Sequence, residues 1–294
     1  MARPSRAAAM STHDPARRLL LRRIAAAALA ASASRIAAQP TGAPPLRVGL
    51  VPYLSTRALI TLYQPLREHL ERALQRPVRL YTAQDFRALA VNARNGEYDI
   101  ALLPPHIARI AVADWGQRFV ARLAQTSEVQ LVTLPSTELA LPDGLRGQRV
   151  AAIDPLSITT LVLRHWLAER GLAVGRDVDI RYVHSISSGM VALERGDAVA
   201  LVGAIGQFRD AIDGGTAQLK VVASLAAIPT PAFVAHPRVS DDDLARIRQA
   251  LLGFVPQSAG AGISSSPFVA GSVEDFVRVE SYAIEARRLL AQTK

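Results

Sequence analysis

The sequence has no cysteine, which excludes disulfide bonds, thiolate metal sites, cysteine nucleophiles and a lipid-modified N-terminal cysteine. Aromatic residues make up only 5% of the chain, so few rings are present to stack on nucleic-acid bases. Half of the 294 residues are hydrophobic, which excludes a disordered or collagen-like chain. The length is enough for one large domain or two medium ones.

The positive charge is concentrated at the N-terminus. Residues 1–38 hold seven arginines and one acid, Asp14, and therefore carry +6 of the total charge of +9. The remaining +3 is ordinary for a soluble protein, and no dense run of Lys or Arg follows residue 38. We therefore expect no nucleic-acid partner.

Residues 1–38 have the pattern of an export signal. The basic stretch at 16–23 precedes the apolar run at 24–33, and Ile36-Ala37-Ala38 resembles a cleavage site with small residues. The run is too short and too rich in alanine to serve as a membrane anchor. The pattern predicts export to the periplasm, with cleavage near Ala38.

Two details of this signal stay open. The pair Arg17-Arg18 followed by leucines is similar to a twin-arginine signal, but it lacks the usual preceding Ser or Thr and the following Phe. Both the twin-arginine and the general secretory routes are therefore candidates. Met1 and Met10 are both candidate start residues.

After a flexible linker at 39–45, strand and helix patterns alternate. Residues 46–53 indicate a buried strand, 56–74 a helix with apolar residues on one face, and the alternation restarts at 148–154. Alternation of this kind predicts mostly parallel sheets flanked by helices. We therefore expect an α/β protein with two lobes and a cleft where strand ends meet helix N-termini.

The order of the extended segments suggests lobe boundaries. Residues 131–134 and 233–236 are candidates for two paired crossover strands, because a complete α/β unit separates them. The prediction is a first lobe of residues 46–132 plus 233–294 and a second lobe of residues 133–232. The C-terminal helices then pack back on the first lobe.

Five segments carry a resemblance to a known family. They are RVGLVPYLS (47–55), LYQPLREHLERAL (62–74), NGEYDIALLPPHIARIA (95–111), LRGQRVAAIDPLSITTLVLRHWL (145–167) and GMVALERGDAVALVGAIGQF (189–208). In order and spacing they resemble the periplasmic solute-binding proteins of ABC importers, in the branch that binds phosphate, phosphite or phosphonate. The resemblance implies a two-lobe type II periplasmic binding protein fold with two crossover strands, and no catalysis. It also implies a small anionic ligand and a permease in the inner membrane as partners, and we expect a monomer.

Ser157, Thr159 and Thr160 are the first candidate ligand-binding residues. They begin a strongly apolar helix, and a helix N-terminus offers unpaired N–H groups and partial positive charge to an anion. Simple helix capping is the alternative, since an N-cap Ser or Thr needs no ligand. The resemblance favours ligand binding, because the matching position in the family is a Ser/Thr-rich loop. That loop often has a glycine where this chain has Leu161.

Tyr53, Ser55 and His106 follow strands of the first lobe. The resemblance implies an aromatic or hydroxyl side chain facing the cleft near Tyr53 and Ser55, whereas a turn residue is the alternative. At the position of His106 the family more often has Tyr. A histidine there could donate to an oxyanion or merely cap a helix.

His184 and Ser187 belong to a polar cluster that enters a helix of the second lobe. The family commonly has a His-Asp pair here, at the position of Ile186 and Ser187, so His184 is a candidate substitute. The family also tends to have an acid in the strand near 198–203, where this chain has none. That acid recognises the amino group of aminoalkylphosphonates, so the resemblance disfavours such a ligand.

Other functions lack their motifs. The six histidines show no metal-ligand spacing, and no GxSxG, P-loop or GxGxxG motif is present. We therefore expect no metal, no cofactor and no enzymatic activity. The sequence predicts an exported receptor for a small oxyanion that feeds an ABC importer. The alternative is a periplasmic sensor subunit of the same fold that presents a ligand to a membrane histidine kinase.

Overall fold

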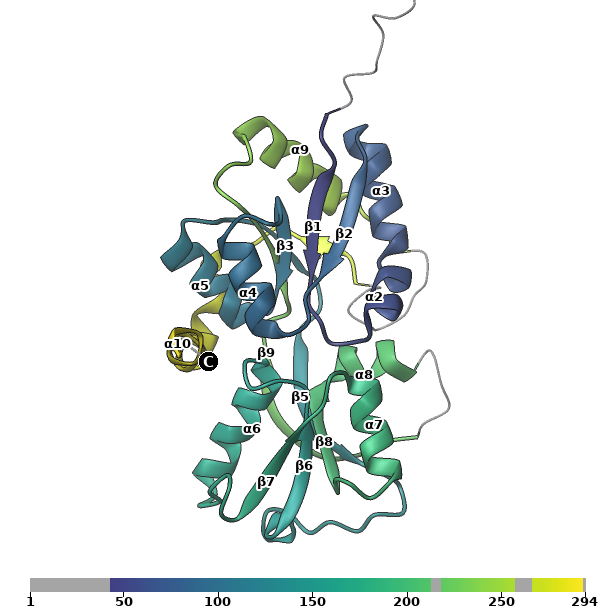
Figure 1. Ribbon diagram of the computed structural model, residues 1–294, viewed down its shortest axis with the longest axis vertical. Helices are drawn as coiled ribbons and strands as arrows, with labels where there is room; N and C mark the ends of the chain where they lie inside the picture. The colour runs from purple at the N-terminus through teal and green to yellow at the C-terminus, as the bar shows by residue number, and fades with distance from the viewer. Residues whose placement is uncertain (1–42, 213–217, 257–265, 293–294) are drawn as a thin grey trace, which may run out of the picture. The chain divides into compact units, whose positions relative to one another are not determined.

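The computed structural model describes residues 43–212, 218–256 and 266–292 (Figure 1). The predicted export signal at 1–38 and most of the predicted linker lie outside these residues. All elements below belong to the unit that begins at Pro44. Within the described ranges, no helix is both long and apolar enough to cross a membrane.

The first lobe is built on a six-stranded sheet with the order β11-β4-β10-β3-β1-β2. Its strands are β1 (Leu46–Leu50), β2 (Val78–Thr82), β3 (Ile100–Leu103), β4 (Arg118–Leu123), β10 (Ala232–Ala235) and β11 (Phe268–Val269). Strand β1 pairs in parallel with β2 and β3, whereas β10 is antiparallel to β3 and β4. Every residue of β3 and β10 is buried, so these strands form the centre of the core.

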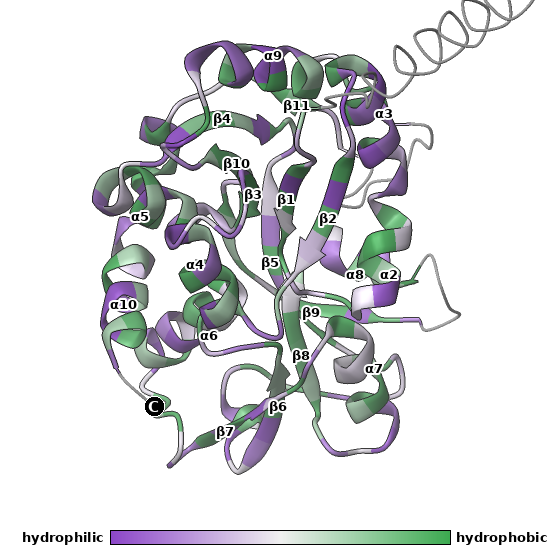
Figure 2. Ribbon diagram, turned by 45° about the horizontal axis from the view of Figure 1, so that its top comes forward, coloured by the Kyte–Doolittle hydropathy of each residue, from purple (hydrophilic) through white to green (hydrophobic). Residues whose placement is uncertain are grey.

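Helices flank this sheet. They are α2 (Thr56–Leu62), α3 (Gln64–Leu74), α4 (Phe86–Arg94), α5 (Pro105–Trp115), α9 (Asp241–Leu252) and α10 (Glu280–Ala291), with the 3₁₀ helix η2 (Val273–Val279). The C-terminal helices pack on this lobe, α9 on α3 and α10 on α5, and α10 also contacts α6 (Ile158–Glu169). Figure 2 shows both hydrophilic and hydrophobic colours on α9 and α10, which is typical of helices with one buried face.

The second lobe is built on a five-stranded sheet with the order β7-β6-β8-β5-β9. Its strands are β5 (Ser127–Thr133), β6 (Gln148–Ala152), β7 (Val178–Tyr182), β8 (Ala200–Ala204) and β9 (Lys220–Ile228). Its helices are η1 (Asp143–Leu145), α6 (Ile158–Glu169), α7 (Ile186–Glu194) and α8 (Ile205–Ile212). Strand β6 is parallel to β7 and β8, and β5 is antiparallel to β8 and β9.

The two lobes repeat the same local structure. Asp85 caps α4 and Ser185 caps α7, each by accepting a hydrogen bond from a backbone N–H three residues later. The two helices have equal length and are each followed by a glycine with positive φ, Gly96 and Gly196. In the same way, β1 leads through a short loop to α2, and β6 leads to α6. Both lobes therefore direct helix N-termini to the carboxyl ends of their parallel strands.

The crossovers differ from the prediction. We expected residues 131–134 and 233–236 to pair with each other, but β5 pairs with β8 and β9 while β10 pairs with β3 and β4. Each crossover instead inserts a strand into the sheet of the other lobe, and the inserted strand is antiparallel to its neighbours. This is why both sheets are mixed. The chain changes sheets between Leu123 and Ser127 and again between Ile228 and Ala232, so the predicted boundary at residue 132 falls inside β5.

Candidate ligand-binding site

A small cavity of about 30 Å³ lies between residues of the two lobes. It is lined by Val51, Tyr53, Phe86, Pro104, Pro105, Ser127, Ser157, Ile158, Ala204, Gln207, Ile228 and Pro231. These residues lie at or after the carboxyl ends of β1, β2, β3, β6 and β8, or belong to the two crossovers. This volume is far below the roughly 300–1,000 Å³ of pockets that enclose a small ligand.

The N-terminus of α6 reaches this cavity without a side-chain cap. Ser157 is the N-cap residue, yet its Oγ lies 2.8 Å from Oγ1 of Thr159 and makes no hydrogen bond to the backbone of the helix. Ser157, Thr159 and Thr160 are buried almost completely, with at most 1% of their surface exposed. Oγ1 of Thr160 is buried and has no hydrogen-bond partner among the described residues. Of the three, only Ser157 lines the cavity, at the start of the 12-residue helix, and Thr159 and Thr160 are buried next to it in the sequence.

Asp154 holds the loop that leads into α6. Its Oδ1 accepts a hydrogen bond of 2.7 Å from the N–H of Leu156, and its carbonyl oxygen accepts one of 3.0 Å from the N–H of Ser157. Behind the loop, Leu161 is fully buried in the hydrophobic core. The leucine that stands in place of the family's glycine is thus part of the packing that fixes the helix.

His106 connects α5 of the first lobe to this loop. The side chain is fully buried, and Nε2 lies 2.9 Å from the carbonyl oxygen of Leu156. A carbonyl oxygen only accepts, so Nε2 carries the hydrogen and donates it. Burial lowers the pKa of His106 from 6.5 to about 4, which keeps the ring neutral at pH 7.

Tyr53 connects the first lobe to α8 of the second. Its hydroxyl donates a hydrogen bond of 2.6 Å to Oδ2 of Asp210, and both side chains are buried. Burial raises the pKa of Tyr53 well above its ordinary value, and the nearby Tyr63 and Asp210 raise this pKa further. The phenol therefore stays protonated and remains a donor.

Asp210 was not among the predicted site residues. The strand at 198–203 has no acid, and Asp210 stands in α8, the next helix. Asp210 stands three residues after Gln207, which lines the cavity, and residues three apart share a helix face. This spacing is the signal in the sequence that could have identified it.

The other predicted residues occupy exposed positions. Ser55 is exposed and caps α2, its Oγ accepting a hydrogen bond of 3.4 Å from the N–H of Ala58. His184 and Ser187 are exposed, whereas Ser185 between them is buried and caps α7. The structure thus brings Tyr53 and His106 together with the hydroxyl cluster of α6, and it leaves Ser55, His184 and Ser187 outside the buried cavity.

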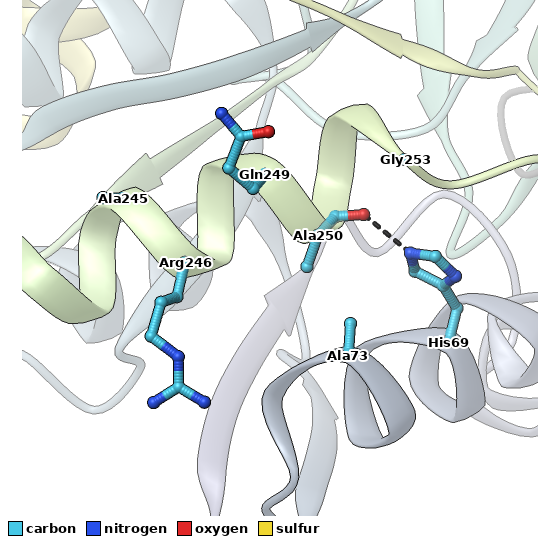
Figure 3. Close-up of a pocket in the computed structure, with 7 residues that line it drawn as sticks. All are labelled: His69, Ala73, Ala245, Arg246, Gln249, Ala250 and Gly253. Atoms are coloured by element: carbon cyan, nitrogen blue, oxygen red, sulfur yellow. Dashed lines mark hydrogen bonds between the residues drawn. The ribbon is translucent and has the colours of Figure 1, made fainter.

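A larger groove on the first lobe lies between α3 and α9 (Figure 3). It has a volume of about 460 Å³ and is lined by His69, Ala73, Ala245, Arg246, Gln249, Ala250 and Gly253. Nε2 of His69 is within 2.7 Å of the carbonyl oxygen of Ala250, so this nitrogen is already paired. None of the groove residues comes from the second lobe, which separates the groove from the cavity between the lobes.

Comparison with protein families identifies the chain. Residues 48–275 match the family described as the periplasmic substrate-binding protein of phosphonate ABC transporters. The chain belongs to this family. Its members are periplasmic proteins that bind substrates for transport, so the predicted family is confirmed.

Solved structures of this family and of related families have the same fold. A binding protein component of an ABC phosphonate transporter from Pseudomonas aeruginosa is 15% identical, with a TM-score of 0.68 over 83% of this chain and 87% of that chain. PhnD1 from Prochlorococcus marinus, in complex with methylphosphonate, is 11% identical, with a TM-score of 0.69 over 83% and 98%. The alkanesulfonate-binding protein SsuA from Xanthomonas axonopodis pv. citri, bound to MOPS, is 18% identical, with a TM-score of 0.54 over 85% and 84%.

At these identities the similarity establishes the fold alone. It confirms the predicted α/β architecture of two lobes, the type II periplasmic binding protein fold. No curated protein is similar enough to this phosphonate-family protein to count as a match.

Proposed function

We propose that this protein is an exported receptor that binds a small oxyanion of the phosphate, phosphite or phosphonate type and delivers it to an ABC permease in the inner membrane. The observation that most directly supports this proposal is the N-terminus of α6, which has no side-chain cap, three buried hydroxyl groups and no hydrogen-bond partner for Thr160 Oγ1 among the described residues. Membership of a transport family favours this role over that of a sensor subunit for a histidine kinase, and over an enzyme.

The site can stabilise an oxyanion without a full counter-charge. The first-turn N–H groups of an α-helix have no acceptor within the helix, and the helix dipole places partial positive charge there. The hydroxyl groups of Ser157, Thr159 and Thr160 are further donors, and each hydrogen bond to a charged acceptor contributes about 1.5–3 kcal/mol. The neutral His106 fixes the loop by holding the carbonyl group of Leu156.

The remaining parts of the proposal concern the cell. The receptor acts as a monomer in the periplasm, which it reaches by the twin-arginine or the general secretory route after cleavage of residues 1–38. Its function needs no metal or cofactor. Ser55, His184 and Ser187 stay candidate contacts that extend the α6 site toward the first lobe and toward α7.

A thermal-shift screen of the protein without residues 1–38 tests the proposal. The ligands are phosphate, phosphite, methylphosphonate, aminoethylphosphonate, alkanesulfonates and carboxylates. A ligand at 100 times its Kd stabilises the folded state by about 2.7 kcal/mol, which raises Tm by roughly 5–10 °C in a protein of this size. We expect such a shift with at least one phosphorus oxyanion.

Variants separate the α6 site from other anion sites. The triple variant Ser157→Ala, Thr159→Val, Thr160→Val removes the hydroxyl cluster and should abolish the shift. Ser240→Ala is the matched control, because it removes an N-cap hydroxyl from α9, which does not line the cavity, and should preserve the shift. The proposal fails if no oxyanion shifts Tm, or if the shift survives in a folded triple variant.

A further inference from the structure

Among the described residues, Arg164 and His165 of α6 join the lobes through Glu285 of α10, and further hydrogen bonds do so around the cavity. The bonds around the cavity connect Tyr53 Oη to Asp210 Oδ2, His106 Nε2 to the carbonyl oxygen of Leu156, Phe86 N to Asp154 Oδ2, and Ile186 N to the carbonyl oxygen of Tyr53. Among the four, only the bond of Tyr53 with Asp210 joins two side chains. At 2.6 Å it is also the shortest, and it links residues 157 positions apart in the sequence.

This bond has the geometry of a strong hydrogen bond. Bonds from a hydroxyl to a carboxylate measure about 2.5–2.7 Å and are roughly twice as strong as neutral ones. Tyr53 is 1% exposed and Asp210 is 6% exposed, so water does not compete for either group. Burial and the neighbouring carboxylate keep the phenol protonated, which preserves the donor.

The Tyr53–Asp210 hydrogen bond lies at the cavity, where it opposes ligand binding. Tyr53 lines the cavity, which has a volume of only about 30 Å³. Methylphosphonate has five heavy atoms, whereas pockets that bury a small ligand typically measure about 300–1,000 Å³, so this cavity is too small to enclose it. Admission of such a ligand requires the lobes to separate, and a bond of 2.6 Å between the lobes breaks when they do.

We propose that the Tyr53–Asp210 hydrogen bond is a clasp that holds the two lobes together in competition with the ligand. The inference rests on the proposed function only for the location of the ligand. Only molecules with an open clasp bind the ligand, so the apparent Kd equals the intrinsic Kd divided by the open fraction. Tyr53 was predicted from the sequence to contact the ligand, and the two roles predict opposite effects for loss of its hydroxyl group.

The first measurement needs no ligand. The chain has no native cysteine, so Val91→Cys on α4 and Val191→Cys on α7 accept spin labels at exposed positions, one on each lobe. Double electron–electron resonance of the ligand-free protein then reports the distance between the lobes. Tyr53→Phe, which removes only the hydroxyl, should give a longer and broader distance distribution, and Asp210→Asn should change it in the same direction.

The second measurement uses isothermal titration with methylphosphonate and inorganic phosphate. Tyr53→Phe should bind whichever of them the wild type binds about tenfold more tightly, since a hydrogen bond to a charged group no longer opposes opening. Tyr182→Phe is the control, because it makes the same chemical change on β7 at a ring that is 44% exposed. It should change neither the distances nor the affinity.

The outcomes are distinguishable. An unchanged distance distribution in Tyr53→Phe overturns the clasp, and weaker binding by this variant overturns the competition and supports direct contact with the ligand. If neither anion binds the wild type but the distances respond as expected, the proposed ligand class fails while the clasp stands.

Discussion

Buried His106 predicts a specific acid sensitivity. Its pKa is about 4 in the folded protein and 6.5 when unperturbed, so at pH 4.5 the unfolded chain takes up a proton that the folded chain does not. The contribution of neutral His106 to the free energy of unfolding is fully present above pH 6.5 and is lost as the pH falls from 6.5 toward 4. Each pH unit in this window removes about 1.36 kcal/mol.

The expected magnitude is measurable. Lowering the pH from 7.5 to 4.5 crosses two units of the window, which amounts to about 2.7 kcal/mol and a fall in Tm of roughly 5–10 °C from this residue alone. Carboxyl groups also titrate near pH 4.5 and need a reference. His106→Gln supplies it, because Gln can still donate to the carbonyl oxygen of Leu156 but does not titrate.

The assay compares urea unfolding of the wild type and His106→Gln between pH 4.5 and 8 at constant ionic strength. The carboxyl groups are common to both proteins and cancel in the difference. As the pH falls from 8 to 4.5, we expect the free energy of unfolding of His106→Gln to decrease by about 2.7 kcal/mol less than that of the wild type. Parallel stability curves would refute the reasoning, because they would mean that His106 is protonated equally in both states.

Three other substitutions test the packing around the site by urea unfolding. Gly49→Ala should cost about 1–3 kcal/mol, because a Cβ would lie 2.5 Å from the Tyr98 ring; a loss below about 0.5 kcal/mol contradicts that clash. Leu161→Ala should cost about 2–5 kcal/mol, since Leu161 is fully buried, and a loss typical of a surface site contradicts its place in the core. Asp85→Ala should cost about 1 kcal/mol through loss of the 2.6 Å cap on the N–H of Ala88, whereas Asp85→Asn should retain most of it.

Local sequence patterns predicted the strands and helices, whereas the sheet that each strand joins depends on pairing with distant residues. The alternation of strands and helices follows from side-chain periodicity, which is a property of neighbouring residues. One local signal was available but unused: the predicted helix at 56–74 divides at Tyr63 into α2 and α3, because Pro65 stands in the first turn of α3. The sheets that accept β5 and β10 depend on partners far along the chain, and their hydrophobic runs fit either sheet.

Some residues of the site were likewise predictable from local sequence, and others are brought together only by the fold. The hydroxyl cluster of α6 was predictable, because a helix start and its hydroxyl residues are adjacent in the sequence. The exposure of Ser187 depends on helix phase, since Ser185 is the N-cap and Ser187 falls on the outer side of the first turn. Tyr53 and Asp210 lie 157 positions apart and meet only in the folded chain, so no local sequence pattern predicts their contact.

The repeated structure of the lobes gives a reason to place the ligand at α6 in particular. Ser55 and Ser157 are N-cap residues of equivalent helices, which follow β1 and β6. Ser55 is exposed and caps its helix with its own hydroxyl, whereas Ser157 is buried and bonds to Thr159 instead. Helix donors left uncapped at an exposed position are satisfied by water, but at a buried position their desolvation costs about 1–3 kcal/mol for each group. A buried, uncapped helix start therefore carries a cost that its exposed equivalent avoids, and a bound oxyanion offsets that cost by accepting from the same donors.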